Sequence, residues 1–216
     1  MRSAPYTLIV GAAPAPGAEE AYRRIVNAAA WVVAADGGLE VCLRADRMPD
    51  VVIGDFDSVD AAVLGRARGA GATIVRFPAE KDESDLDLAL AYVRRQGAPA
   101  VRFTAAFSGR LDHTLAALGT LLRSADLQGR LEEPGFDGHV VDALQRPSLT
   151  LAARPGQGLS VFSLDPATEV SIDGVRYPLD RHPLGVLSSL GLSNVARAAE
   201  QTVTVHTGVA IVLIGA

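Results

Sequence analysis

The sequence Val51-Val52-Ile53-Gly54-Asp55-Phe56-Asp57-Ser58 decides how the first half of this chain folds. Its first three residues form an uninterrupted β-branched run, which is typical of a strand buried in a parallel sheet. A glycine ends the run, and two carboxylates follow, one residue apart, where the chain leaves the sheet. Carboxylates this close repel each other unless a cation lies between them. We therefore expect a buried strand that ends either in an ordinary acidic turn or in a site for a hard divalent cation.

Short apolar runs of the same kind repeat on both sides of this stretch, separated by segments of helical composition such as 18–30 and 61–69. Alternating strands and helices predict a parallel sheet with right-handed crossovers and helices on both faces. The predicted strands are 6–10, 31–35, 51–53, 73–77 and 100–107.

A polar or glycine-rich segment follows each predicted strand. In open parallel sheets, ligands bind beyond the carboxyl ends of the strands, so these segments predict one shared site. The segments are Gly11–Pro14, Asp36-Gly37-Gly38, Gly54–Ser58, Glu80–Asp87 and Ser108–His113.

The fourth segment opens a predicted helix and carries five carboxylates in eight residues. Ser84 and Asp87 have the spacing of a capping box, but capping alone does not need so many acids. Lys81 lies among these acids and either neutralises them or contacts a phosphate. A solvated acidic helix start is the simpler alternative.

The fifth segment also opens a predicted helix. Ser108 can cap it, Gly109 permits a close backbone approach, and Arg110 offers a planar fork that suits phosphate. Asp112 either completes a metal site or holds Arg110. We interpret His113 as a histidine at a helix start, bonded to a backbone group, in preference to a catalytic one.

The pattern changes in the second half of the chain. The stretch 129–138 is rich in glycine, proline and charge, which predicts a boundary between an α/β domain (1–127) and a second domain (128–216). Short strand-like runs without helical spacers then predict an antiparallel β-sandwich. Asp173-Gly174 and Thr207-Gly208 are typical of hairpin turns. The predicted strands are 139–144, 148–152, 159–164, 169–172, 175–179, 202–206 and 209–214. Ser193-Asn194 could offer a polar edge for a heterocycle, but from the residues alone we interpret it as a turn.

The composition limits the classes of function. The chain has 216 residues, 49% of them hydrophobic, and a net charge of −5. This charge argues against nucleic acid as a partner, which usually requires a basic face. Cys42 is the only cysteine, so a reducing cytoplasm is expected. No signal peptide or membrane-spanning run is evident, so we expect no membrane association.

In the order and spacing of these motifs, the chain resembles the thiamine pyrophosphokinase (thiamine diphosphokinase) family. The matching residues are Asp36-Gly37-Gly38, Gly54–Ser58, Lys81-Asp82 with Ser84-Asp85, Gly109–His113, Gly174–Leu179 and Ser193-Asn194. The resemblance implies a Rossmann-like nucleotide domain, a β-sandwich, and a homodimer with thiamine bound between subunits. It also implies Mg²⁺-dependent transfer of a pyrophosphoryl group from ATP to the hydroxyethyl oxygen of thiamine, with release of AMP.

The same resemblance implies roles for individual residues. It makes Asp55, Asp57 and Asp85 the Mg²⁺ ligands, directly or through water, and it makes Asp112 a further active-site carboxylate. Phosphate and nucleotide contacts are implied for Asp36, Gly37, Gly38, Lys81, Ser108, Gly109, Arg110 and His113. Thiamine contacts are implied for Ser193 and Asn194. The sequence does not identify a general base.

Three alternatives remain at this point. A haloacid-dehalogenase-type phosphatase would use the two carboxylates of Asp55-Phe56-Asp57 as nucleophile and acid. That family has the pair at its first strand and a later Gly-Asp pair for metal. In this chain the pair follows the third predicted strand, and the later pair is absent. A related pyrophosphokinase would act on a pterin-like alcohol. A nucleotide-sensing dimer without activity would have little use for both carboxylate pairs.

Overall fold

The computed structural model describes residues 5–57, 59–107 and 110–215. Contacts divide the chain into two compact units. The first comprises Met1–Leu127 with Leu131–Pro134, and the second comprises Gln128–Arg130 with Gly135–Ala216. Within the described ranges, no helix is both long enough and apolar enough to cross a membrane.

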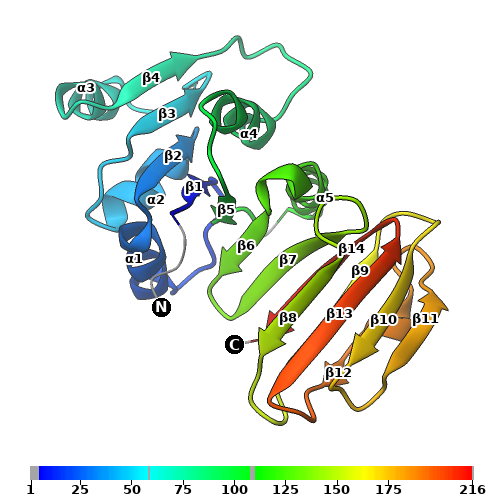
Figure 1. The fold of residues 1–216 in the computed structure, drawn as a ribbon. Coiled ribbons are helices and arrows are strands. Elements are labelled where there is room, and N and C mark those ends of the chain that lie inside the picture. Colours follow the sequence, from blue (N-terminus) through cyan, green and yellow to red (C-terminus); the bar gives the residue numbers. More distant parts are fainter. Residues whose placement is uncertain (1–4, 58, 108–109, 216) are drawn as a thin grey trace. The chain divides into compact units, whose positions relative to one another are not determined.

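The first unit is built on a parallel sheet, as predicted (Figure 1). Strands β1 to β5 pair in parallel in the order β5-β1-β2-β3-β4. Their bounds are β1 (Thr7–Val10), β2 (Trp31–Ala35), β3 (Val51–Gly54), β4 (Thr73–Arg76) and β5 (Val101–Thr104). A further strand, β6 (Arg130–Glu133), lies next to β5.

Helices cover both faces of this sheet, because every residue of β1 and β3 is buried and apolar side chains alternate between the two faces. On one face, α1 (Glu19–Ala28) and α2 (Gly38–Arg44) pack over the strands; on the other lie α4 (Asp85–Arg95) and α5 (Leu111–Leu122) (Figure 1). Helix α3 (Ala61–Gly69) and the short 3-10 turn η1 (Ala125–Leu127) complete the unit.

The second unit is a sandwich of two antiparallel sheets, as predicted. One sheet has the order β12-β9-β14-β7 and the other β11-β10-β13-β8. The first sheet contains β7 (Phe136–Asp142), β9 (Gly158–Ser163), β12 (Asn194–Val195) and β14 (Val209–Gly215). The second contains β8 (Ser148–Ala152), β10 (Glu169–Asp173), β11 (Leu179–Pro183) and β13 (Glu200–Thr207). Inward-facing apolar side chains from both sheets, such as Val161, Val203 and Val212, form the core.

Both predicted hairpin turns differ in the structure. Residues 175–179 do not form a strand, since Val175 makes only an isolated bridge to Ala196 and β11 begins at Leu179. The connection after Asp173-Gly174 is therefore longer than a two-residue turn. At Thr207-Gly208 the flanking strands β13 and β14 belong to different sheets, so this glycine marks a corner of the sandwich. The predicted linker 129–138 contains β6 and the start of β7.

Candidate functional site

A cavity of about 500 Å³ lies beyond the carboxyl ends of β1, β2 and β5, between the first turns of α4 and α5. This is the edge of the sheet where the sequence predicts a ligand. Small residues form most of the wall, so much of the surface offered to a ligand is backbone. The lining residues are Gly11–Ala13, Ala35, Asp36, Ser84–Leu86, Ala105, Ala106, Arg110, His113, Ala116 and Ala117.

The strands that lead to this edge end in strained backbone. Asp36 after β2, Phe56 after β3 and Ala105 after β5 have φ values of 45°, 61° and 51°. Left-handed backbone is costly for residues with a side chain and persists where surrounding structure enforces it, often at functional sites. In the Asp36-Gly37-Gly38 segment, a Cβ on Gly38 would lie only 2.1 Å from the carbonyl oxygen of Val10. Glycine is therefore required there by the close approach of α2 to the end of β1.

Lys81 joins two of the predicted metal ligands. Its Nζ lies 3.4 Å from Oδ2 of Asp55 and 3.0 Å from Oδ1 of Asp85, with only 12% of the side chain exposed. Lys81 is also the only lysine in the sequence, where every other basic residue is arginine. Strand β3 and the first turn of α4 thus converge on one positive charge beside the cavity, which Asp85 lines.

The charges of this group stabilise each other. Burial lowers the pKa of the Lys81 ammonium, but its contacts with Asp85 and Asp55 outweigh burial and hold the pKa above its usual value. The pKa of Asp55 lies below its usual value, first because its Oδ1 accepts a hydrogen bond from the backbone N–H of Asp57 at 3.0 Å, and then because of Lys81. Lys81 and Asp55 therefore each favour their charged form.

The donor chemistry of this group fits Mg²⁺. Asp55 and Asp85 converge on a cation, and their oxygens are the hard ligands that Mg²⁺ prefers. Asp57 is exposed next to Asp55. Within the described ranges, no three His, Cys, Asp or Glu side chains are grouped closely enough to hold a metal by themselves. Mg²⁺ usually takes one or two carboxylates from a protein and completes its shell with phosphate and water.

Arg110 and Asp112 form a bidentate pair at the start of α5. The guanidinium Nη2 lies 2.5 Å from Oδ2 of Asp112, and the Nε lies 3.2 Å from Oδ1. Arg110 holds the pKa of the Asp112 carboxyl at about 2. Both side chains are exposed and Arg110 lines the cavity, so a phosphate can compete for its fork. His113 is exposed and also lines the cavity, whereas Ser108 and Gly109 lie outside the described residues.

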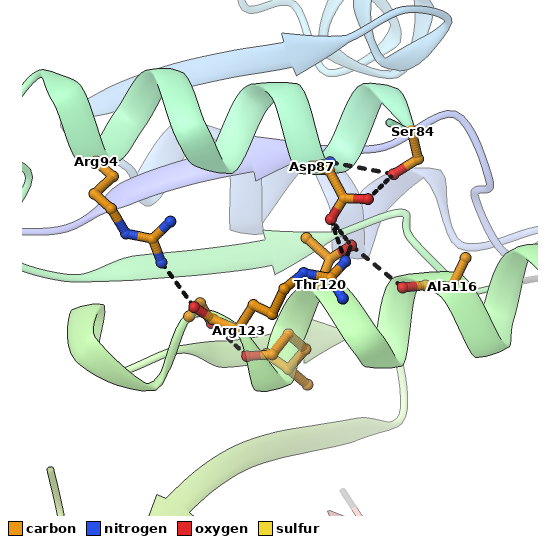
Figure 2. Close-up of polar contacts among 8 residues, drawn as sticks. Ser84, Asp87, Arg94, Ala116, Thr120 and Arg123 are labelled. Atoms are coloured by element: carbon orange, nitrogen blue, oxygen red, sulfur yellow. Dashed lines mark hydrogen bonds and ion pairs between the residues drawn. The ribbon is translucent and has the colours of Figure 1, made fainter. Parts of the chain in front are cut away.

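Asp87, predicted only as part of a helix cap, connects α4 to α5 (Figure 2). Its backbone N–H donates to Oγ of Ser84 at 3.2 Å, as the capping-box spacing predicts, but Ser84 returns a hydrogen bond to Oδ2 of Asp87 at 2.9 Å. Oδ1 of Asp87 accepts from Thr120 of α5 at 2.6 Å and from Arg123, the residue that follows the end of α5. Asp87 therefore fixes the two helices whose first turns form one side of the cavity.

Ser193 and Asn194 lie in the second unit. Asn194 is buried, and its amide pairs with the backbone of Tyr177: Oδ1 accepts from the N–H at 3.0 Å and Nδ2 donates to the carbonyl at 2.7 Å. Asn194 therefore holds the 175–178 segment, and Tyr177 itself is exposed. Ser193 is exposed with φ 55°. The structure thus places the exposed Ser193 hydroxyl next to an amide that is bonded to the backbone of Tyr177 and Val195.

Two residues near the cavity were missed by sequence reasoning, Tyr22 and Glu133. Both are buried and bonded to each other, with Tyr22 Oη donating to Oε2 of Glu133 at 2.9 Å. Alternation along β6 would have indicated Glu133, because it shares a strand face with buried Leu131. Because residues 129–138 were interpreted as a domain boundary, this alternation was not recognised as a strand.

Comparisons with known proteins agree over most of the chain. The family model described as "Thiamin pyrophosphokinase, catalytic domain" matches residues 22–131, and the one described as "Thiamin pyrophosphokinase, vitamin B1 binding domain" matches residues 148–212. A thiamine pyrophosphokinase of Bacillus subtilis (strain 168) is 24% identical over 187 residues, which are 85% of this chain and 86% of that protein.

Solved structures have the same fold. A thiamin pyrophosphokinase from Geobacillus thermodenitrificans superposes with a TM-score of 0.80 at 24% identity, covering 97% of each chain. The yeast thiamin pyrophosphokinase gives a TM-score of 0.79 at 13% identity, covering 99% of this chain and 86% of the yeast chain.

Proposed function

Because the chain belongs to the thiamin pyrophosphokinase family, we propose that it transfers a pyrophosphoryl group from ATP to the hydroxyethyl oxygen of thiamine. The thiamine oxygen forms a bond to the β-phosphorus of ATP, the bond between that phosphorus and the α,β-bridging oxygen breaks, and AMP leaves. The products are thiamine diphosphate, AMP and the proton of the hydroxyl group.

The observation that carries this proposal is the convergence of Asp55, Lys81 and Asp85 beside the cavity that Arg110 lines. Phosphoryl transfer depends on positioning and on charge neutralisation more than on a strong nucleophile. Cys42 is no candidate nucleophile, since burial raises the pKa of its thiol to about 12.

We assign the nucleotide to the first unit. In this assignment Lys81 and Arg110 bind the phosphates, and the Asp36-Gly37-Gly38 segment, whose Asp36 lines the cavity, contacts the nucleotide. Asp55, Asp57 and Asp85 would hold Mg²⁺, which when bound neutralises charge on the phosphate oxygens. Asp112 pairs with the Nε and Nη2 of Arg110, and a phosphate would compete with it for this fork.

We assign thiamine to the second unit, with the Ser193 hydroxyl as a contact and Asn194 as support for the Tyr177 segment. We further propose that the active protein is a homodimer in which thiamine lies between subunits. Support for the acceptor comes from the match of residues 148–212 to the vitamin B1 binding domain.

Incubating the purified full chain with ATP, Mg²⁺ and thiamine tests the proposal. Chromatography should show equal amounts of AMP and thiamine diphosphate, and neither should form without thiamine or with EDTA. Release of inorganic phosphate from phosphoesters in the absence of ATP would instead favour a phosphatase. AMP formation with a pterin-like alcohol but not with thiamine would reassign the acceptor.

A further inference from the structure

Two loops that form one wall of the cavity contain almost no polar side chains of their own. They are the loop after β1, with Gly11–Ala13, and the loop after β5, with Ala105 and Ala106. Backbone bonds join them: Gly11 N donates to the carbonyl of Thr104 at 2.9 Å, and Ala13 N donates to that of Ala105 at 2.8 Å. A Cβ on Gly11 would lie 2.6 Å from the Ala105 oxygen, which shows how closely the loops approach.

A buried carboxylate supports both loops from behind. Glu133, the last residue of β6, is 7% exposed. Its Oε1 accepts a hydrogen bond from the backbone N–H of Ala106 at 2.9 Å. Its Oε2 accepts from the Tyr22 hydroxyl at 2.9 Å, and the Tyr22 oxygen accepts in turn from the N–H of Ala15 at 2.8 Å. One side chain thus holds the loop after β5 directly and the loop after β1 through Tyr22.

Burying the Glu133 carboxylate costs free energy, and an apolar side chain at this position would avoid that cost. Burial raises the pKa of Glu133 to about 7, although hydrogen bonds from Ala106 and Tyr22 act in the opposite direction. Its hydrogen bonds come from the Tyr22 phenol and from backbone N–H groups of the loop after β5, and none of these donors carries a positive charge. Strain at Ala105, with φ 51°, adds a cost at the same place. A buried group with a shifted pKa next to strained backbone is typical of functional sites.

We propose that Glu133 is a positioning residue for the nucleotide: by holding both loops it sets the shape of the cavity wall and hence the affinity for ATP. The inference rests on the proposed function, because it assumes that the cavity binds ATP. Glu133 does not itself line the cavity, so it acts through the backbone of residues 11–15 and 105–107.

The carboxylate is matched to its partners, because both of its oxygens accept hydrogen bonds. In Glu133→Gln the side chain keeps its volume, but its NH₂ group cannot accept from the Tyr22 hydroxyl, so the bond that Tyr22 donates to the carboxylate is lost. Tyr22→Phe leaves the hydrogen bond between Glu133 and Ala106 and removes only the two bonds of the Tyr22 hydroxyl, to Glu133 and to Ala15. Glu132→Gln is the matched control, since Glu132 is the neighbouring carboxylate of β6 and pairs with Arg102 at 2.7 Å.

The test measures steady-state KM values for ATP and thiamine, together with calorimetric binding of α,β-methylene-ATP to the full chain. Glu133→Gln should weaken nucleotide binding about tenfold, the effect of one well-formed hydrogen bond to a charged group, and leave the thiamine KM within about twofold. Tyr22→Phe should give a smaller loss with the same selectivity, and Glu132→Gln should match the wild type. Amide exchange should also quicken in both loops of the Glu133 variant.

Each alternative outcome is decisive. If folded Glu133→Gln binds the nucleotide as tightly as the wild type, this inference is overturned. Tyr22→Phe decides in the same way if Glu133→Gln does not fold. In either case, AMP formation by the wild type upholds the proposed function. A loss of kcat in proportion to the unfolded fraction, with both KM values unchanged, would reduce Glu133 to a purely structural residue. A wild-type chain that neither binds nor consumes ATP would overturn both proposals.

Discussion

Lys81 shows at the level of one residue how the site depends on the type of positive charge. An ammonium is a compact point charge that fits between two carboxylates, whereas a guanidinium is a planar fork. The chain uses arginine for every other basic position, so the one lysine coincides with the one place where Asp55 and Asp85 share a cation.

Removing this charge should abolish most activity. We expect Lys81→Met to lower kcat/KM for ATP by about 10²–10³, the effect of losing one preorganised electrostatic contact to a transferred group. Lys81→Arg should recover only part of the loss. The control is Arg68→Met, which removes an exposed charge on α3. Normal turnover by Lys81→Met in an AMP assay would show that Lys81 only neutralises its acidic neighbours.

Glu133 should give the fold a distinctive pH dependence. Its folded pKa of about 7 exceeds the ordinary 4.5, so the folded state binds the proton more tightly. The stability that this proton confers is present below 4.5 and is lost as pH rises through 7. The shift corresponds to roughly 3 kcal/mol. Urea unfolding from about pH 5 to about pH 8 should therefore show the wild type losing stability relative to Glu133→Gln, and a constant difference would contradict the shift.

Sequence reasoning located the acidic and basic residues around the cavity but not the residues that hold them. Asp55, Lys81, Asp85 and Arg110 stand out because charged groups follow strands whose carboxyl ends share one edge. Glu133 does not stand out, because its role depends on a loop that is distant in sequence and close in space. The residues alone favoured a turn at Ser193-Asn194, and the pairing of Asn194 with the backbone of Tyr177 could not be read from spacing.

At the scale of elements, the Asp87 cluster sets the spacing of α4 and α5. Burial raises the pKa of Asp87, but hydrogen bonds from Thr120, Arg123 and Ser84 outweigh burial and hold the pKa below its usual value. The stabilisation is therefore present at neutral pH and lost as pH falls through the folded pKa. Its partners come from both helices, so the cluster links elements rather than capping one.

Neutralising this carboxylate should loosen the helix pair. We expect Asp87→Asn to lower the free energy of unfolding by about 1–3 kcal/mol, because hydrogen bonds to a charged group are lost. Asp126→Asn provides the comparison: Asp126 forms an exposed bidentate pair with Arg94, and such pairs contribute about 0–1 kcal/mol. Equal losses in chemical denaturation would show that the Asp87 cluster has no special role.

The elements themselves were largely predictable where pattern and pairing agree. Buried parallel strands such as β3 are revealed by their continuous apolar runs. The errors fell on connections. Thr207-Gly208 has the chemistry of a hairpin turn, yet the chain uses the same glycine to pass from one sheet to the other, and local sequence does not distinguish these uses.

At the scale of the whole chain, the two units correspond to two family models. A substitution in one unit should therefore change the KM of one substrate and leave the KM of the other unchanged. Asn194→Ala removes the amide that holds Tyr177, and we expect the thiamine KM to rise several-fold, since each lost bond is worth roughly 1 kcal/mol, while the ATP KM stays unchanged. Leu144→Ala, a substitution at an exposed position in the same unit, is the control. Equal rises in both KM values would return the Ser193-Asn194 segment to the status of a turn.

The position of β14 has a consequence for how the chain folds during its synthesis. This strand is the last in sequence, yet it lies between β7 and β9, and its buried residues Ala210 and Val212 belong to the core of the sandwich. The parallel strands β1 to β5, by contrast, are all synthesised by residue 104. During translation, at about 5–20 residues per second, the first unit can begin to fold while the sandwich still lacks the strand between β7 and β9. The sandwich therefore cannot close before β14 has been synthesised, and until then the edges of β7 and β9 that pair with β14 stay without this partner.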